Sequence, residues 1–434
     1  MDKMADVLGR AGAWCGQNKY LSAIKNAFQN FMPLTIAGAI GVLWCNVLVN
    51  DQTGLGLFFK PIMALDFLNP AFQAVNFCTI SCITVGITLG IAQEIGVWNM
   101  GAEKAGYIPG LVGLAAWLSV TNTSHMVEGA KEAFTGIAGN ELGATGLFTG
   151  MIIGVLSVEL FCFFEKQDAL KIKMPEQVPP GVARAFEVLV PATITLIITA
   201  CIGSACYNLT GLYLNDVIKN GIQGPLGAVG ATIPGVMIIY LVIMLFWLVG
   251  IHGNNMLSAV KEALFTPLAL ENVEKFNKGE KPTNIINMYA LQMWGEFGGS
   301  GVTIGLVIAI MIFGKREDNK AIATLSLVPG LFNINETVTF GIPMVLNPIL
   351  GIPFVFACLV TILVGYVLTV IGFCPVACLT VPWTTPPLVF GFLATGANIM
   401  GAVTQAILIV VSTVIYTPFL IAYEKYQNKQ AAEA

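Results

Sequence analysis

The sequence predicts an all-α integral membrane protein, because charged residues are scarce and apolar runs are long. Of the 434 residues, 56% are hydrophobic and only 11% are charged, whereas a soluble domain carries about 25% charged residues. Residues 337–423 contain no Asp, Glu, Lys or Arg, and similar runs cover 26–50, 67–93, 188–215 and 220–260. A helix crosses a bilayer core with about 20 apolar residues, so several of these runs can span a membrane.

About ten transmembrane helices are expected along the chain. The first half reads as five smooth spans, at 30–49, 73–93, 107–121, 143–164 and 188–207. The second half is less regular, and its expected spans lie at 236–251, 299–313, 353–372, 374–395 and 398–422.

Three regions follow from this reading. Residues 1–29 mix charged and apolar positions at helical spacing and lack a signal-peptide cleavage site, which favours an amphipathic segment on the cytoplasmic surface. Residues 30–215 are expected to form a membrane scaffold, and the interrupted residues 216–434 to carry the solute chemistry. The polar, proline-containing loop 165–187 reads as a linker.

The basic residues predict the orientation through the positive-inside rule. They cluster at the N-terminus and after the fourth and sixth expected spans, at Lys3, Arg10, Lys19, Lys25, Lys166, Lys171, Lys173, Arg184, Lys261, Lys275, Lys278 and Lys281. Both termini are therefore expected in the cytoplasm. The turn Lys315-Arg316-Glu317-Asp318 conflicts with this count, because it follows the seventh span and would lie outside unless a neighbouring segment is re-entrant.

Two segments indicate such re-entrant hairpins. Residues 322–352 are apolar but interrupted by glycine and proline, and the stretch from His252 to about Leu270 is similar. Non-helical backbone at membrane depth occurs where it is buried in protein or lines a cavity. Transporters commonly bind their substrates at such broken segments.

Glu336 is the strongest candidate binding residue, because it stands alone before the long charge-free run. An ionisable group inside a membrane is costly and is a functional hypothesis by default. The flanking amides of Asn333 and Asn335 can donate and accept hydrogen bonds, as a polyhydroxylated ligand requires. The alternative is a structural carboxylate that caps a broken backbone.

His252 is the second candidate, and it stands between glycines with Asn254 and Asn255 after it. A polar site competes here with a purely structural histidine. No second histidine or carboxylate stands at ligand spacing, so no metal site is expected. The ten cysteines fit neither a zinc site nor a redox pair, and no cofactor or nucleic-acid partner is expected.

Two further segments carry candidate residues. Glu296 precedes a glycine-rich turn with Gly299 and Ser300, where the glycines allow close backbone approach; binding and plain interfacial placement remain open for Glu296. Trp383, with Thr384 and Thr385, interrupts a later apolar run. The indole could stack on the apolar face of a sugar while the hydroxyls meet its polar edge, or the segment could be a proline-broken connection.

These four segments together resemble the lactose, cellobiose and diacetylchitobiose branch of phosphotransferase-system IIC permeases, in the glucose superfamily of IIC proteins. The matching residues, in order, are Gly250-Ile251-His252-Gly253, Gly298-Gly299-Ser300-Gly301, Asn333-Ile334-Asn335-Glu336 with Asn347-Pro348-Ile349, and Pro382-Trp383-Thr384-Thr385-Pro386-Pro387 with residues 391–396. Phe31-Met32-Pro33-Leu34 after Tyr20-Leu21 is also similar.

The resemblance implies a homodimer of ten-span protomers in the bacterial inner membrane. The N-terminal half would supply the dimer interface, and the C-terminal half would hold a disaccharide between two re-entrant hairpins. His252 and Glu336 would contact the hydroxyl to be phosphorylated, an elevator-type movement would carry the sugar across, and a cytoplasmic IIB protein would supply the phosphoryl group.

The chain departs from the family pattern near its end. The family usually continues Leu-Ala-Thr-Gly-Gly-Asp-Trp-Arg-Gly, whereas residues 393–401 read Leu-Ala-Thr-Gly-Ala-Asn-Ile-Met-Gly. The usual proline after Glu336 is Thr337. These differences leave the disaccharide unnamed. An ion-coupled secondary sugar transporter, with Glu336 and Glu296 as ion sites, is the alternative. A third reading, an intramembrane enzyme, lacks a nucleophile or metal constellation.

Overall fold

The computed structural model describes residues 10, 13–14, 17–51, 55–125, 134–175, 177–225 and 230–433. Helices dominate these residues, and the chain forms two compact units. The N-terminal unit contains residues 17–38 and 75–228, and the C-terminal unit contains residues 39–74 and 229–434. Residues 1–9, 11–12 and 15–16 of the predicted segment 1–29 lie outside the described residues, and from Lys19 onward the segment is continuous with the first long helix.

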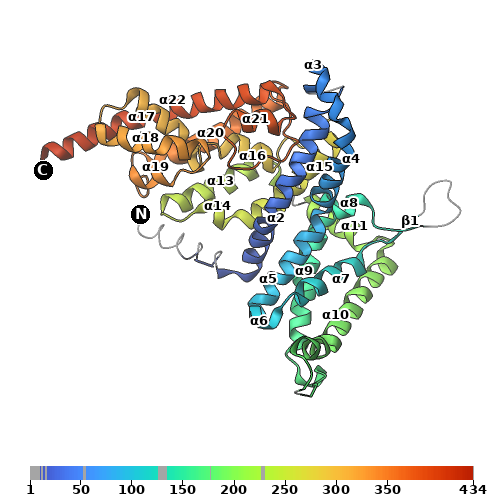
Figure 1. Ribbon diagram of the computed structural model, residues 1–434. Coiled ribbons are helices and arrows are strands. Elements are labelled where there is room, and N and C mark those ends of the chain that lie inside the picture. The colour runs from blue at the N-terminus through green and yellow to red at the C-terminus, as the bar shows by residue number, and fades with distance from the viewer. Residues whose placement is uncertain are drawn as a thin grey trace. The chain divides into compact units, whose positions relative to one another are not determined.

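The described part of the first half contains four α-helices of 18 or more residues, with short helical pieces between them (Figure 1). In chain order the elements are α2 (Lys19–Leu43), η1 (Trp44–Leu48), α3 (Leu55–Phe58), η2 (Lys60–Leu68), α4 (Asn69–Cys78), η3 (Ile80–Cys82), α5 (Ile83–Met100), α6 (Ala102–Ala105), α7 (Ile108–Val120), β1 (Ser124–His125), β2 (Phe134–Thr135), α8 (Gly139–Leu142), α9 (Ala144–Glu165), η4 (Asp168–Leu170), α10 (Pro180–Thr210), α11 (Leu214–Ile218) and η5 (Lys219–Gln223). The strands β1 and β2 pair antiparallel.

The described part of the second half contains three α-helices of 20 or more residues, with shorter helices and irregular segments between them. In chain order the elements are α13 (Ile233–Leu248), α14 (Gly253–Met256), α15 (Ser258–Asn277), α16 (Met288–Gly295), η6 (Ser300–Val302), α17 (Ile304–Phe313), α18 (Glu317–Leu331), α19 (Glu336–Gly341), α20 (Gly351–Val370), α21 (Val389–Ala394) and α22 (Ile399–Glu433). The prediction of a span at 374–395 is not met by a continuous helix, since only α21 is helical there. Pro375, Pro382, Pro386 and Pro387 remove the backbone donors that a helix needs.

Helices α5, α7, α9 and α10 pack against one another as the core of the N-terminal unit. Small residues allow this close packing. Gly113 lies against Ala92, and Gly96 lies against Pro109, so closely that a Cβ at either glycine would overlap its neighbour. Helices in membranes use such small residues to bring their backbones together.

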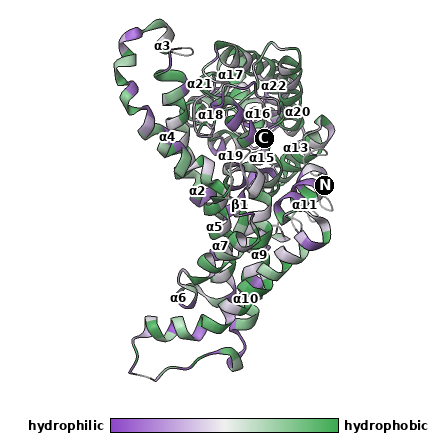
Figure 2. Cartoon of the chain, turned by 90° about the vertical axis from the view of Figure 1, so that its right-hand side faces the viewer, coloured by the Kyte–Doolittle hydropathy of each residue, from purple (hydrophilic) through white to green (hydrophobic). Residues whose placement is uncertain are grey.

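Six helices in the described part of the chain are long and apolar enough to cross a membrane. They are Lys19–Leu48, Lys60–Met100, Ala144–Glu165, Pro180–Thr210, Gly351–Val370 and Ile399–Glu433. The segments Met288–Val302 and Ile304–Phe313, bent by 59° at their junction, make a seventh if they form one broken span. Figure 2 shows that hydrophobic residues dominate the helices of both units.

The outer face of α22 is apolar, like the helices described above. Its exposed large apolar residues are Ile399, Val403, Val410, Val414 and Ile421. Their spacing places them on one side of the helix. A continuous exposed apolar stripe of this length is unfavourable in water and is expected where lipid tails are the solvent.

The opposite face of α22 carries a row of buried polar side chains, Gln405, Ser412 and Tyr416, called here the polar row. Tyr416 donates a hydrogen bond of 2.8 Å to the carbonyl of Gly301, and Ser412 donates one of 2.9 Å to that of Val302. Both acceptors lie in η6, where Gly301 has φ of 76° and the helix is broken. The polar row therefore satisfies carbonyl groups that the break leaves without helical partners.

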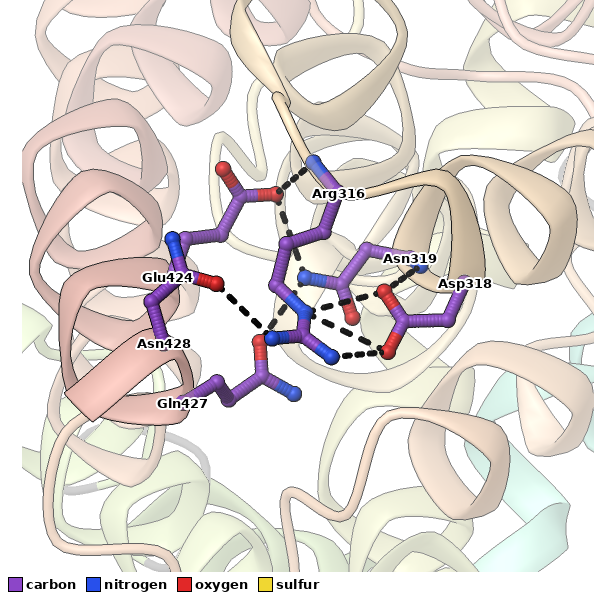
Figure 3. Close-up of polar contacts among 6 residues, drawn as sticks. All are labelled: Arg316, Asp318, Asn319, Glu424, Gln427 and Asn428. Atoms are coloured by element: carbon purple, nitrogen blue, oxygen red, sulfur yellow. Dashed lines mark hydrogen bonds and ion pairs between the residues drawn. The ribbon is translucent and has the colours of Figure 1, made fainter. Parts of the chain in front are cut away.

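The end of α22 is tied to the turn between α17 and α18 by a polar clamp (Figure 3). Glu424, which is 5% exposed, accepts hydrogen bonds from the backbone N–H groups of Lys315 and Arg316 at 2.8 and 3.3 Å. The side chains that complete the clamp are Arg316, Asp318, Asn319, Gln427 and Asn428. The Arg316 guanidinium holds the pKa of the Asp318 carboxyl below its usual value. The Glu424 carboxylate also faces the N-terminus of α18, where a negative charge is favoured.

Candidate functional site

The glycine-rich turn after α16 contacts the break between α18 and α19. The backbone N–H of Gly298 donates to Oδ1 of Asn333 at 2.6 Å, and Nδ2 of Asn335 donates to the carbonyl of Ser300 at 2.8 Å. Gly299 has φ of 87°, and a Cβ there would lie 2.5 Å from that of Asn335. The glycine is therefore required by the close approach of the two segments.

Asn333 also joins this pair of segments to the proline-rich loop. Its Nδ2 donates to the carbonyls of Trp383 at 2.5 Å and Thr385 at 3.1 Å. The backbone of Asn333 has φ of 63°, a left-handed conformation that asparagine adopts more readily than most residues. One side chain thus connects three of the four predicted segments, which are far apart in the sequence.

His252 lies in the fourth segment, close to charged residues of the other segments. It lies within electrostatic range of Glu336, Glu296 and Lys261. Its Nδ1 accepts a hydrogen bond of 3.3 Å from the backbone N–H of Asn255, so the neutral ring carries its proton on Nε2. The ring also packs against Trp247, with the ring centroids 4.4 Å apart. His252 is therefore held in one orientation with a donor available.

The predicted binding residues divide into two groups. Asn333 and Asn335 donate their amides to protein carbonyls, and they hold the loops in place. In contrast, within the described part of the chain no hydrogen bond reaches the side chains of Glu336, Asn254, Asn255, Thr384 or Thr385. Glu336 is exposed, and Trp383 is 45% exposed. These open groups combine a carboxylate, amides, hydroxyls and an aromatic face, which suits a neutral polyhydroxylated ring.

Glu296 has a fixed environment that the sequence does not indicate. Its Oε1 accepts a hydrogen bond of 2.8 Å from the hydroxyl of Tyr240 and forms an ion pair with Lys261. Lys261 is only 6% exposed. The interpretation of Lys261 as a positive loop charge is therefore wrong. The residue lies on the helix α15, is buried, and pairs with Glu296.

Gln405 is a second residue that the sequence does not single out. Its Oε1 accepts from the backbone N–H groups of Leu388 and Gly391 at 2.8 and 2.7 Å, and its Nε2 donates to the carbonyl of Met293. Gln405, which lies on α22, thereby ties the start of α21, directly after the Trp383 loop, to α16. The isolated buried glutamine in an apolar helix is the signal that could have identified it.

No group of three His, Cys, Asp or Glu side chains among the residues that the structure describes is arranged to hold a metal ion.

Comparison with known proteins identifies the family of this arrangement. The model of the family described as phosphotransferase system, EIIC, matches residues 25–358. The chain is 33% identical over 429 residues to the oligo-β-mannoside-specific EIIC component of the phosphotransferase system of Bacillus subtilis (strain 168), covering 98% of this chain and 94% of the relative. It is 29% identical to the cellobiose-specific EIIC component of Lactococcus lactis subsp. lactis (strain IL1403), covering 98% of both chains.

A solved structure is similar over almost the whole length. It is the crystal structure of the transporter ChbC, the IIC component of the N,N'-diacetylchitobiose-specific phosphotransferase system. The TM-score is 0.88 at 30% sequence identity, with 97% of each chain covered.

Proposed function

Because the chain belongs to the EIIC family of the phosphotransferase system, we propose that it is the membrane permease for a disaccharide of the cellobiose, diacetylchitobiose or lactose kind. The relatives are named for oligo-β-mannoside, cellobiose and diacetylchitobiose, which supports this substrate class. A cytoplasmic IIB protein phosphorylates the sugar that the permease presents.

The observation that carries this proposal is the set of open polar groups around Asn333. Glu336 accepts hydrogen bonds from sugar hydroxyls, and His252 Nε2 donates one. Trp383 covers an apolar face of a sugar ring, while Thr384 and Thr385 meet its polar edge. Asn254, Asn255, Glu296, Gly299 and Ser300 complete the proposed binding set, with Gly299 and Ser300 contributing backbone.

We further propose that residues 30–215 form the scaffold and dimer interface and that residues 216–434 form the transport domain. In this proposal the transport domain moves against the scaffold of a homodimer, as an elevator. The support is that the broken segments around Gly298, Asn333 and Trp383 all lie in the second half and contact one another, because broken helices build binding sites in transporters.

For the membrane topology, we propose about ten crossings, two re-entrant hairpins and cytoplasmic termini in the bacterial inner membrane. The polar clamp supports a cytoplasmic position for Lys315 and Arg316. Both residues bond Glu424 near the end of α22, so the turn lies on the same side as the C-terminal tail. The helices α20 and α22 supply the even number of crossings that this arrangement requires between Lys315 and Glu424.

An ion-coupled secondary sugar transporter is the alternative. In that mechanism Glu296 or Glu336 binds and releases a proton or cation during transport. Glu296 already has a fixed cationic partner in Lys261, which occupies the carboxylate that a coupling ion would have to bind. This pairing favours the phosphotransferase proposal.

Sugar uptake by sealed membrane vesicles tests the proposal. With phosphoenolpyruvate, the general phosphotransferase proteins and the IIB partner, labelled disaccharide should be recovered as its phosphate, and without phosphoenolpyruvate it should not accumulate. With radiolabelled phosphoenolpyruvate, phosphate should appear on the sugar and never on His252, because the phosphoryl group passes directly from the partner. Accumulation of unmodified sugar driven by an ion gradient would instead establish the alternative.

A further inference from the structure

Lys261, Glu296 and Tyr240 form a buried cluster beside the proposed sugar site. Lys261 Nζ and the Tyr240 hydroxyl both contact the same oxygen, Oε1, of Glu296. Lys261 Nζ also lies 5.4 Å from the centroid of the Tyr240 ring, where the ring attracts a cation. The second oxygen of Glu296, Oε2, has no hydrogen-bond partner among the described residues.

The burial of Lys261 requires compensation of its charge. An unpaired charge in a low-dielectric interior carries a large desolvation penalty, and removal of one partner from a buried pair leaves the other uncompensated. Glu296, with a side chain 17% exposed, is the partner that supplies this compensation. The contact with Glu296 therefore compensates the buried cation of Lys261.

The cluster also connects two segments of the site. Lys261 lies on α15, which follows His252 and α14. Glu296 ends α16 and stands two residues before Gly298, whose N–H bonds Asn333. The ion pair thus ties the segment of His252 to the turn that Asn333 holds against Trp383.

We propose that Lys261 is a positioning residue of the sugar site, which with Tyr240 fixes Oε1 of Glu296 and thereby presents Oε2 to a hydroxyl of the sugar. This inference rests on the proposed function and adds the reason why a lysine is buried beside the site. It also assigns Glu296 as an acceptor with one oxygen held by the protein and one reserved for the ligand. The ligand class is a neutral polyol, because the compensated pair adds no net charge.

Equilibrium binding of cellobiose, diacetylchitobiose and lactose to the purified full-length protein tests this role. Lys261→Met should weaken binding of the preferred sugar by about 10-fold to 100-fold, the cost of a lost charge-assisted contact. Lys261→Arg, which keeps the cation, should recover most of the affinity. Lys278→Met is the matched control, because Lys278 follows the same helix but has a side chain 58% exposed, and its affinity should equal that of the wild type.

A pH series distinguishes positioning from a general loss of structure. The titratable groups within electrostatic range of Glu296 are Tyr240, His252, Lys261, Glu262 and Cys358. Because Lys261→Met removes the cation that contacts Glu296, the affinity of this variant should vary with pH more steeply than that of the wild type. The double variant Lys261→Met/Glu296→Gln should lose this additional dependence, because His252 and Glu262 remain in both variants.

The outcomes separate this inference from the proposed function. A wild-type protein that binds none of the three disaccharides contradicts the proposed function. A Lys261→Met protein that binds like the wild type, with the same pH profile, contradicts only the role of Lys261. If Lys261→Met does not fold, Glu296→Gln and Lys261→Arg decide the matter: the inference requires weaker binding for the first and near-normal binding for the second, and it is wrong if either result is reversed.

Discussion

Replacement of Asn333 by alanine tests the organisation of the site most directly. The substitution removes three hydrogen bonds, to Gly298, Trp383 and Thr385, each with a net contribution of about 0.5–1.5 kcal/mol. Alanine also pays roughly 1 kcal/mol more than asparagine or glycine for the left-handed backbone. The loop arrangement should therefore lose roughly 2.5–5.5 kcal/mol.

The assay combines sugar binding by calorimetry with thermal unfolding of the purified protein. Asn333→Ala should weaken binding by about two decades, because a decade corresponds to about 1.4 kcal/mol. Asn333→Gly removes the same hydrogen bonds without the backbone penalty, so it should be about 1 kcal/mol less destabilised than the alanine variant.

Asn347→Ala is the matched control for these variants. Asn347 also makes three hydrogen bonds, to Pro343, Ile349 and Leu350, but lies outside the proposed site. Its replacement should lower the unfolding temperature and leave sugar affinity intact. Wild-type affinity in folded Asn333→Ala protein would refute the claim that Asn333 assembles the site.

Three other predictions concern the ligand, the topology and the backbone. Glu336→Gln should weaken sugar binding by about one to two decades, the value of a charge-assisted hydrogen bond, while folding is retained; unchanged affinity would remove Glu336 from the site. In a cysteine-free background, single cysteines at Glu317 and Lys429 should resist an impermeant thiol reagent in intact cells and react in inside-out vesicles, and labelling of Glu317→Cys from outside would contradict the cytoplasmic turn. Ala397 has φ of 58°, so Ala397→Gly should raise the free energy of unfolding, measured by thermal unfolding, by about 0.5–1 kcal/mol; a lower stability would show that the strain is absent.

Much of the helical framework could be predicted because a bilayer leaves the backbone few choices. Charge-free runs longer than a membrane thickness become α10, α20 and α22, with boundaries shifted by several residues. Glycine and proline also marked the breaks near Gly299 and Gly341 correctly. The prediction of a span at 374–395 rests on hydrophobicity alone. Four prolines in this apolar segment lack the backbone N–H groups that a continuous helix needs.

The open groups of the site could be anticipated, but their supports could not. Glu336 and Trp383 stand out because a charge or a proline-flanked indole is conspicuous in an apolar run. The sequence around Lys261 suggests a loop charge, because nothing near this residue in the sequence indicates that Glu296 is its partner in the fold. The three-way role of Asn333 likewise depends on loops that come together only in the folded chain.

Some supports lie on a different helix, far along the chain. Gln405 bonds Leu388 and Gly391 from a distance of more than a dozen residues, and Tyr416 and Ser412 bond η6 across more than a hundred. Spacing alone does indicate that these three polar residues share a face of α22. It does not indicate which carbonyl and amide groups that face will meet.

The position of the polar row at the end of the sequence has a consequence for biogenesis. Proteins are synthesised from the N-terminus, and earlier parts begin to fold first. Gly301 and Val302 leave the ribosome more than a hundred residues before Ser412 and Tyr416, the side chains that satisfy their carbonyls. The carbonyls of the broken segment therefore depend on water or other temporary partners until α22 inserts. The hydrogen bonding of η6 is thus completed late, by a helix made more than a hundred residues after it.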